Sequence, residues 1–536
     1  MSPTPWSWNK PPLPAAYSVP GYNFPISRDK IWYRAPWGVE TLFGLASHLQ
    51  PGFSDILFSC QASLPSNNYR HPFSLQAVRE AVRLLRFQRP TIAARLARPI
   101  LDHGDPAAKD SCSIYEAVST EEDIEAWLDQ VIVDRCATAE HTGSLQEAMD
   151  LVMRDVGRGF DLPPSTLFHL HVIITPDSAS IGLIARGSHV LVDAFGLTAS
   201  VNQLIANIAT NLGNDHRNEL PWGEEVERLV GSAVDFARTT WSADEAERDN
   251  KMLNTAISIA KEFKVTSGLP IPKPLATRTT TSVFVRTFTG DMLRNLIIAA
   301  RGQNCTLYPV LFAAMIISVF RVSTPSSLDG LAVPVLFTPA NLRHKGILDR
   351  DNDVLSALSY NTIVARDLGR FVSDFSTLDG LWTIAREIGF QLKEQQDDIR
   401  RSVIWMDQFI ANISSMMEAG AKARGGSLPT TTTPRVSSLG IMDRYLTHRH
   451  ELSAGGTLEV SHPCITVCVS YASPLFGYMI GLHAFTWMNT FYMCFSFPEA
   501  YMGTLKEQKQ DCKAGSVWSW SEEFIGLLRS VSDSVE

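Results

Sequence analysis

Apolar and polar positions follow strand spacing and then helical spacing between residues 55 and 87. The run 55–64 (DILFSCQASL) is mostly apolar and predicts a strand. Asn67, Asn68 and Pro72 mark a loop after it, and Ser74 is placed to cap a helix. Apolar side chains then recur at helical spacing, at Leu75, Val78, Val82, Leu84, Leu85 and Phe87.

A second patterned stretch begins at residue 167. Leu167–Thr175 and Ile181–Ala185 are typical of strands, and the sequence PDS between them predicts a hairpin turn. Val190–Val192 is a further short strand-like run. Apolar residues then return to helical spacing, at Leu197, Val201, Leu204, Ile205 and Ile208. We therefore expect the residues near 187–196 to join a strand to a helix.

The C-terminal half repeats this order of elements. Its pattern predicts a strand at 283–288, an amphipathic helix at 291–301, a buried helix at 306–322, a strand at 331–337 and a final helix at 520–531. The shared order indicates two similar α/β domains. A chain of 536 residues is also too long for one ordinary core. We expect an N-terminal domain at 1–220, a crossover at 221–281 and a C-terminal domain at 282–536.

The stretch 475–497 is apolar enough, and long enough, to span a bilayer. It is interrupted by polar residues such as His483 and Asn489, and it is rich in aromatic and β-branched residues. That composition favours two buried strands with a break between them. We therefore expect no integral membrane insertion.

The composition is that of a globular protein, with 45% hydrophobic and 19% charged residues. The net charge of −9 argues against a nucleic-acid partner. Residues 1–20 lack the basic and apolar regions of a signal peptide, and the eight cysteines form no Cys-x-x-Cys unit. We expect buried thiols, no metal site and a cytoplasmic location.

One short motif carries candidate chemistry. His189 and Asp193 form a His-x-x-x-Asp unit within 187–196 (GSHVLVDAFG). An imidazole can accept a proton from an alcohol or amine during acyl transfer, and a carboxylate four residues on can fix the turn that carries it. His169 and His171 alternate on the preceding strand and share a face, but no third metal ligand accompanies them.

These pieces resemble the CoA-dependent acyltransferases with a His-x-x-x-Asp motif, which include plant acyltransferases, peptide-synthetase condensation domains and alcohol acetyltransferases. The resemblance covers nearly the whole chain and is greatest to fungal trichothecene 15-O-acetyltransferases, which acetylate a sesquiterpenoid alcohol. Two features depart from the pattern. Ala194 replaces the usual glycine after Asp193, and the Asp-Phe-Gly-Trp-Gly motif of the plant branch is absent.

The resemblance implies two chloramphenicol-acetyltransferase-like α/β domains, with mixed sheets flanked by helices and a tunnel at their interface. It implies that His189 is the general base, and that Asp193 points away from it to pair with Arg343 in the sequence Asn-Leu-Arg. Ser437 and Ser438, in a segment like the family's Ser-Asn-Leu-Gly, become candidates for oxyanion or CoA contact. Two cations are candidates for the CoA phosphates: Lys422 and Arg424.

The implied function is acetyl transfer from acetyl-CoA, a co-substrate and not a bound cofactor, to a hydroxyl of a bulky apolar alcohol in secondary metabolism. We expect a monomer. A condensation-like domain that uses carrier-protein thioesters, or a non-catalytic binding relative, is the alternative. Ser188 stands where condensation domains usually carry a second histidine, which favours a stand-alone enzyme. A serine hydrolase is disfavoured because the chain has no Gly-x-Ser-x-Gly elbow.

Overall fold

The fold is described from a computed structural model of the chain. The structure describes these residues: 7–9, 17–18, 30–49, 52, 54–64, 72–99, 112–158, 166–212, 219–237, 268–270, 279–323, 333–345, 356–365, 367–368, 377–396, 410, 431–453, 455–469, 478–499 and 517–535. They include the whole of the His-x-x-x-Asp unit and the elements on either side of it.

The chain forms two compact units whose segments alternate along the sequence. Unit 1 contains residues 1–238, 342–358 and 442–468, and unit 2 contains the remainder. The sequence analysis expected each domain to be one continuous segment. Each unit instead contains three segments that are separated in the sequence. The reason is visible in the pairing of strands, because β16 (Thr457–Val467) lies antiparallel to β3 (Ile56–Ser63) in unit 1.

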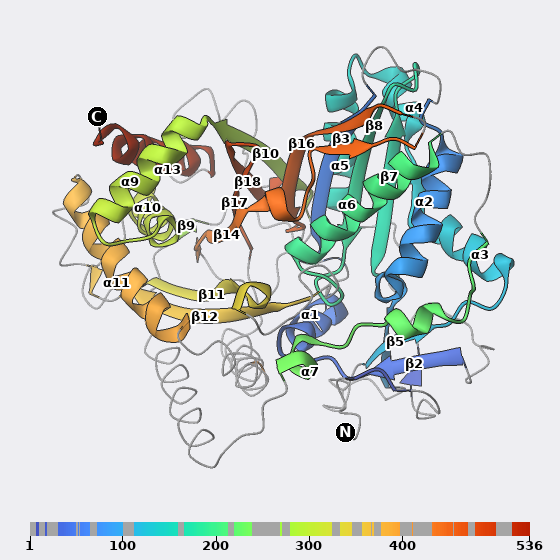
Figure 1. The fold of residues 1–536 in the computed structure, drawn as a ribbon. Helices are drawn as coiled ribbons and strands as arrows, with labels where there is room; N and C mark the ends of the chain where they lie inside the picture. The colour runs from blue at the N-terminus through green and yellow to red at the C-terminus, as the bar shows by residue number, and fades with distance from the viewer. Residues whose placement is uncertain are drawn as a thin grey trace. The chain divides into compact units, whose positions relative to one another are not determined.

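Unit 1 is built on a six-stranded mixed sheet in the order β15-β16-β3-β8-β7-β6 (Figure 1). Its outermost strand β6 runs parallel to β7, whereas the other neighbours are antiparallel. The strands not yet given are β6 (Ile132–Asp134), β7 (Phe168–Ile174), β8 (Ser180–Gly187) and β15 (Arg449–Glu451). A smaller sheet has the order β1-β4-β5-β2, with β1 at Tyr17–Ser18, β2 at Ile31–Arg34, β4 at Arg95–Pro99 and β5 at Cys112–Glu116.

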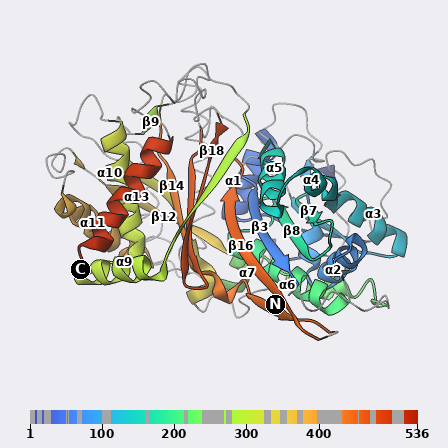
Figure 2. The ribbon, with the colours of Figure 1, turned by 90° about the horizontal axis from the view of Figure 1, so that it is seen from above.

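Helices cover both faces of the six-stranded sheet. The position of Gly182 on β8 faces Met149 of α5, and that of Gly187 faces Leu197 of α6, so the two helices lie on opposite faces. Figure 2 shows the sheet between α5 and α6. The helices of unit 1 are α1 (Gly38–Leu49), α2 (Leu75–Gln88), α3 (Glu121–Val131), α4 (Cys136–His141), α5 (Leu145–Arg158), α6 (Ala194–Asn211) and α7 (Ala233–Ala237).

Most local predictions in unit 1 are confirmed. The Ser74 side chain caps α2 by accepting a hydrogen bond from the Ala77 amide, and β7 and β8 form the predicted hairpin.

The prediction of a strand at Val190–Val192 is wrong. Those residues leave β8 in a turn, because the Leu191 amide donates to the Ser188 carbonyl instead of to a neighbouring strand.

Unit 2 contains a four-stranded sheet in the order β10-β18-β17-β14 and two smaller pairs, β11-β12 and β13-β9. The stretch 475–497 holds the two predicted strands, β17 and β18. Met488 and Asn489 join them with positive φ angles of 48° and 56°, as a two-residue hairpin turn requires. The strands of unit 2 are β9 (Leu269–Pro270), β10 (Thr281–Phe288), β11 (Val333–Asn341), β12 (Leu358–Ala365), β13 (Thr431–Thr432), β14 (Arg435–Ile441), β17 (Gly481–Trp487) and β18 (Thr490–Pro498).

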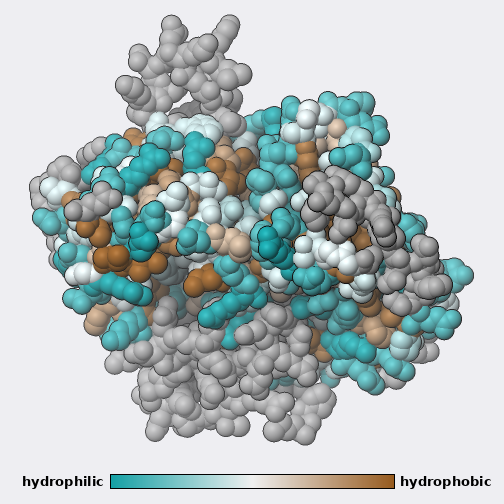
Figure 3. Space-filling view, turned by 45° about the horizontal axis from the view of Figure 1, so that its top comes forward, coloured by the Kyte–Doolittle hydropathy of each residue, from teal (hydrophilic) through white to brown (hydrophobic). Residues whose placement is uncertain are grey.

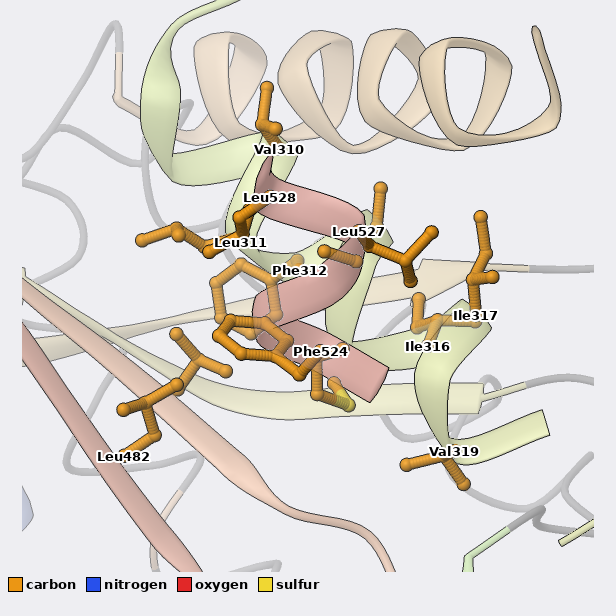
Figure 4. Packing of buried hydrophobic residues seen from close by; sticks show 14 of the residues in the cluster. Val310, Leu311, Phe312, Ile316, Ile317, Val319, Leu482, Phe524, Leu527 and Leu528 are labelled. Atoms are coloured by element: carbon orange, nitrogen blue, oxygen red, sulfur yellow. The ribbon is translucent and has the colours of Figure 1, made fainter. Parts of the chain in front are cut away.

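Helix α10 lies at the centre of the unit 2 core, as its almost uninterrupted apolar sequence predicts. It packs against α11 and α13, and Figure 4 shows Phe312 of α10 beside Phe524 of α13, with Leu482 of β17 nearby. All three side chains are buried. The helices of unit 2 are α9 (Gly290–Gly302), α10 (Leu307–Val322), α11 (Leu378–Gln396) and α13 (Val517–Asp533).

Within the described ranges no single helix has the length and apolarity to cross a membrane. Helices α9 and α10 reach that length only as a pair, bent by 94° at their junction. On the face drawn in Figure 3, apolar residues reach the surface in small groups among hydrophilic ones. Among the described residues, the exposed large apolar side chains come from different elements: Leu151, Ile298, Phe390, Ile441 and Met488.

Candidate functional site

The candidate site is a tight turn between β8 and α6 in unit 1. β8 ends at Gly187, and the amides of Leu191 and Val192 both donate to the Ser188 carbonyl, at 2.8 Å and 3.1 Å. A Cβ atom at position 187 would collide with Val192 Cγ1, so the absence of a side chain lets the turn fold back onto the strand. The turn places the His189 side chain at the end of the sheet.

Asp193 ends the turn and begins the helix. Its Oδ1 accepts from the Gly196 amide at 2.8 Å, which caps α6. Its Oδ2 accepts from Arg343 Nη1 at 2.7 Å and from the Ala357 amide at 2.7 Å. The carboxylate is almost fully buried, with a relative exposure of 1% for the residue. It therefore joins three segments of unit 1: the turn with its helix, the segment at Arg343 and the segment at Ala357.

Arg343 is as deeply buried as its partner. It lies in a short 3-10 helix, Leu342–Lys345, directly after β11, and the Leu342 amide donates to the Ala357 carbonyl at 2.9 Å. Its guanidinium also lies 5.8 Å from the ring centroid of Phe195, in the first turn of α6. The pairing of Asp193 with Arg343 that the resemblance implied is thus present as a contact.

The imidazole of His189 is partly exposed and lies flat against an aromatic ring. Its centroid is 3.9 Å from that of Phe43 in α1, and the two planes differ by 5°. Nδ1 is buried and forms no hydrogen bond of ordinary geometry with the described residues, although the nearby backbone of His189 and Val192 acts to raise the pKa of the ring. Burial lowers the pKa of His189 to about 4, while the charge of Asp193 acts in the opposite direction. The ring is therefore neutral at pH 7 and can accept a proton.

Phe43 is a site residue that the sequence reasoning missed. It lies in an ordinary apolar helix, and nothing in its spacing points to residue 189. A contact between residues so far apart in sequence depends on how α1 packs against the end of the sheet. The sequence alone gives no local signal for such a contact.

The other predicted site residues are not part of unit 1. Ser437 and Ser438 lie on β14 in unit 2, opposite His483 and Ala484 of the parallel strand β17. A register shift follows Ser438, and Gly440 has a φ of 68°. Lys422 and Arg424 lie outside the described residues.

A second polar cluster lies inside unit 1, on the face of the sheet covered by α5. Arg186 pairs with Asp55, with Nε and Nη2 at 2.8 Å and 2.7 Å from Oδ2. His169 is opposite Arg186 in the sheet, and His171 follows on the same face. Burial lowers the pKa of each histidine to about 3, with the Arg186 charge adding to this at His169 and the Arg135 and Arg186 charges at His171. The described residues contain no group of three or more His, Cys, Asp or Glu suited to hold a metal.

Comparison with known proteins identifies the fold. No protein-family model and no curated protein sequence matches the chain. Among solved structures, the trichothecene 15-O-acetyltransferase of Fusarium sporotrichioides superposes with a TM-score of 0.73 at 15% identity, over 97% of this chain and 99% of that one. The first condensation domain of the calcium-dependent antibiotic synthetase superposes with a TM-score of 0.56 at 12% identity, over 94% and 96%.

The starter condensation domain of rhizomide synthetase, solved in complex with C8-CoA and Leu-SNAC, superposes with a TM-score of 0.53 at 12% identity, over 94% of each chain. The chain therefore has the fold of these acyltransferase and condensation-domain structures. The α/β class with mixed sheets flanked by helices, which the resemblance implied, is confirmed.

We predict that Asp193→Asn lowers the free energy of unfolding by about 3–5 kcal/mol, because it removes the carboxylate that pairs with the buried Arg343 guanidinium. Asparagine caps a helix as well as aspartate does, so the lost free energy of unfolding measures the missing charge and not a missing helix cap. Urea unfolding followed by circular dichroism measures it. Asp155→Asn is the matched control, because Asp155 pairs with Arg158 at the surface and should contribute less than about 1 kcal/mol. Equal, small losses in both variants would contradict the prediction.

We also predict that the stability of unit 1 falls as the pH drops below about 6.5, because the unfolded state then binds protons that folded His169 and His171 exclude. Each contributes about 1.4 kcal/mol per pH unit until the pH reaches its folded pKa of about 3. His171→Leu should therefore make the slope of unfolding free energy between pH 6 and pH 4 shallower by about that amount. Replacement of the exposed His141 by Leu is the control. An unchanged slope in His171→Leu would refute this account.

Proposed function

We propose that this protein is a CoA-dependent O-acyltransferase that moves an acetyl group from acetyl-CoA to a hydroxyl of a bulky apolar alcohol. The observation that carries the proposal is the neutral, partly exposed imidazole of His189, on a turn that the Asp193–Arg343 ion pair holds in place. The fold shared with an acetyltransferase along almost the full length of both chains supports it.

His189 is the general base in this proposal. Nδ1 is the buried nitrogen, so Nε2 is the nitrogen that we assign to accept the hydroxyl proton. As the proton leaves, the alcohol oxygen attacks the thioester carbonyl carbon and a tetrahedral oxyanion forms. The intermediate then collapses, the C–S bond breaks, and the imidazolium returns its proton to the leaving thiolate. The products are the ester and free CoA, and no covalent enzyme intermediate is needed.

The low pKa of His189 affects the two proton transfers differently. It keeps the imidazole unprotonated, and so available as a base, at neutral and mildly acidic pH. It also makes the imidazolium a strong acid toward a thiolate, whose conjugate thiol has a pKa of about 8.5. The second transfer is therefore strongly favourable, and the deprotonation of the alcohol is the harder step.

Asp193 has a structural role in this mechanism. Its two oxygens accept from Gly196, Ala357 and Arg343, so the carboxylate fixes the turn and does not act as a relay to the imidazole. Ser437 and Ser438 are proposed to contact the oxyanion or the CoA thioester, because hydroxyl and amide donors stabilise such charge. Lys422 and Arg424 remain candidates for the CoA phosphates.

The acceptor that we propose is a sesquiterpenoid alcohol of the trichothecene class. The support is the similarity to the Fusarium structure, whose reaction is 15-O-acetylation of a trichothecene. The seven described cysteines are free thiols, which is consistent with the proposed cytoplasmic location. We further propose that the enzyme acts as a monomer.

A condensation reaction on carrier-protein thioesters is the second candidate, because condensation domains share the fold. The residue before the motif histidine separates the two. Condensation domains usually have a second histidine there, and this chain has Ser188. Release of free thiol from acetyl-CoA in the presence of a terpenoid alcohol, without any carrier protein, would favour the O-acyltransferase.

We predict that His189→Ala folds normally and loses transfer by about 10²–10⁴-fold in kcat, the usual contribution of a general base. Thiol release from acetyl-CoA with a panel of terpenoid alcohols measures the rate, and circular dichroism checks the fold. His141→Ala, an exposed histidine of unit 1, is the control and should match the wild type. Wild-type turnover by His189→Ala would exclude His189 as the base.

A further inference from the structure

We propose that Phe43 is a positioning residue that holds the imidazole of His189 in its reactive orientation, an inference that rests on the proposed function of His189 as the base. The two rings are parallel to within 5° at a centroid separation of 3.9 Å. At that distance the ring of Phe43 covers one face of the imidazole, so the His189 ring cannot tilt toward α1 without a collision.

The stack matters because no side chain within the described residues holds the second ring nitrogen of His189 by a hydrogen bond. A general-base histidine is commonly held by a hydrogen bond from its second ring nitrogen to a carboxylate or carbonyl. Here Nδ1 forms no hydrogen bond of ordinary geometry with the described residues, although the backbone of His189 and Val192 lies near enough to the ring to raise its pKa. The nearest motif carboxylate, Asp193, is occupied by Gly196, Ala357 and Arg343. Stacking on Phe43 is therefore the side-chain contact that fixes the plane of the ring.

Phe43 can serve this purpose because its helix is firmly anchored. Glu40, one turn earlier in α1, is 1% exposed and forms a two-pronged ion pair with Arg34 of β2, at 2.6 Å and 2.9 Å. The same carboxylate accepts from the Trp37 amide at 3.2 Å, and the Trp37 and Leu42 side chains are buried. These contacts attach the start of α1 to the small sheet of unit 1. They therefore also fix the position of Phe43 in the same helix.

Loss of the stack should affect the rate more than substrate binding. A base that is misplaced by about 1 Å can cost about 10²-fold in rate. In this proposal Phe43 acts on the imidazole and not on CoA. We therefore expect Phe43→Leu, which keeps apolar bulk but has no flat face, to lower kcat by about 10- to 100-fold with little change in the KM for acetyl-CoA. Phe43→Tyr keeps the ring and should retain most of the activity.

The matched control is Phe87→Leu. Phe87 also forms an aromatic contact inside unit 1, with Trp222 at 5.5 Å, but it lies on α2 away from the His189 turn. If Phe43→Leu acted only by loosening unit 1, Phe87→Leu would lower kcat by a similar factor. Similar losses in both variants, or unchanged kcat in Phe43→Leu, would overturn the proposal.

A second readout does not depend on activity. In protein labelled with ¹³C at histidine Cε1, the Phe43 ring current should shift the His189 Hε1 resonance upfield, and the missing signal in His189→Ala assigns it. We expect this shift to be lost in Phe43→Leu and kept in Phe43→Tyr. If His189→Ala retains full turnover, the proposed function fails, while the resonance still shows whether Phe43 orients the ring. An unchanged resonance in Phe43→Leu would refute the stack itself.

Discussion

The buried carboxylate of Asp193 is the interaction on which the rest of the site depends. A charge at that depth is tolerated only because an arginine and two backbone amides compensate for it. Since those donors come from the helix α6 and from the segments at Arg343 and Ala357, the same contacts fix the path of the chain. They hold residues 342–358 in unit 1 although the chain before and after them belongs to unit 2.

In this site, one contact fixes the turn and another environment sets the protonation state of His189. Asp193 fixes the turn, and the imidazole of His189 stays neutral because it is largely buried and donates no hydrogen bond to that carboxylate. One face of the imidazole is covered by Phe43, and the ion pair between Glu40 of α1 and Arg34 of β2 keeps that helix in place. The position and the protonation state of the His189 imidazole are thus set by different contacts. A separate substitution can change each of them.

Much of the local structure, and part of the site, could be predicted from the sequence. Ser74 as a helix cap, the β7–β8 hairpin and the paired strands of 475–497 depend on turn chemistry and periodicity, which act over a few residues. The contact of Asp193 with Arg343 came from family resemblance, because no spacing rule connects them. Val190–Val192 was predicted as a strand from its apolar residues, but these residues are buried in a turn. The place of β16 in the unit 1 sheet, and the approach of Phe43 to His189, depend on long-range packing that periodicity does not encode.

The most direct test of the central claim, a neutral base held by a structural ion pair, is the pH dependence of kcat/KM for acetyl transfer. An unperturbed imidazole loses half of its activity as a base near pH 6.5. His189 should instead keep kcat/KM constant through that region and lose it only with an apparent pKa of about 4. A profile that falls with a pKa near 6.5 in the folded enzyme would contradict the account.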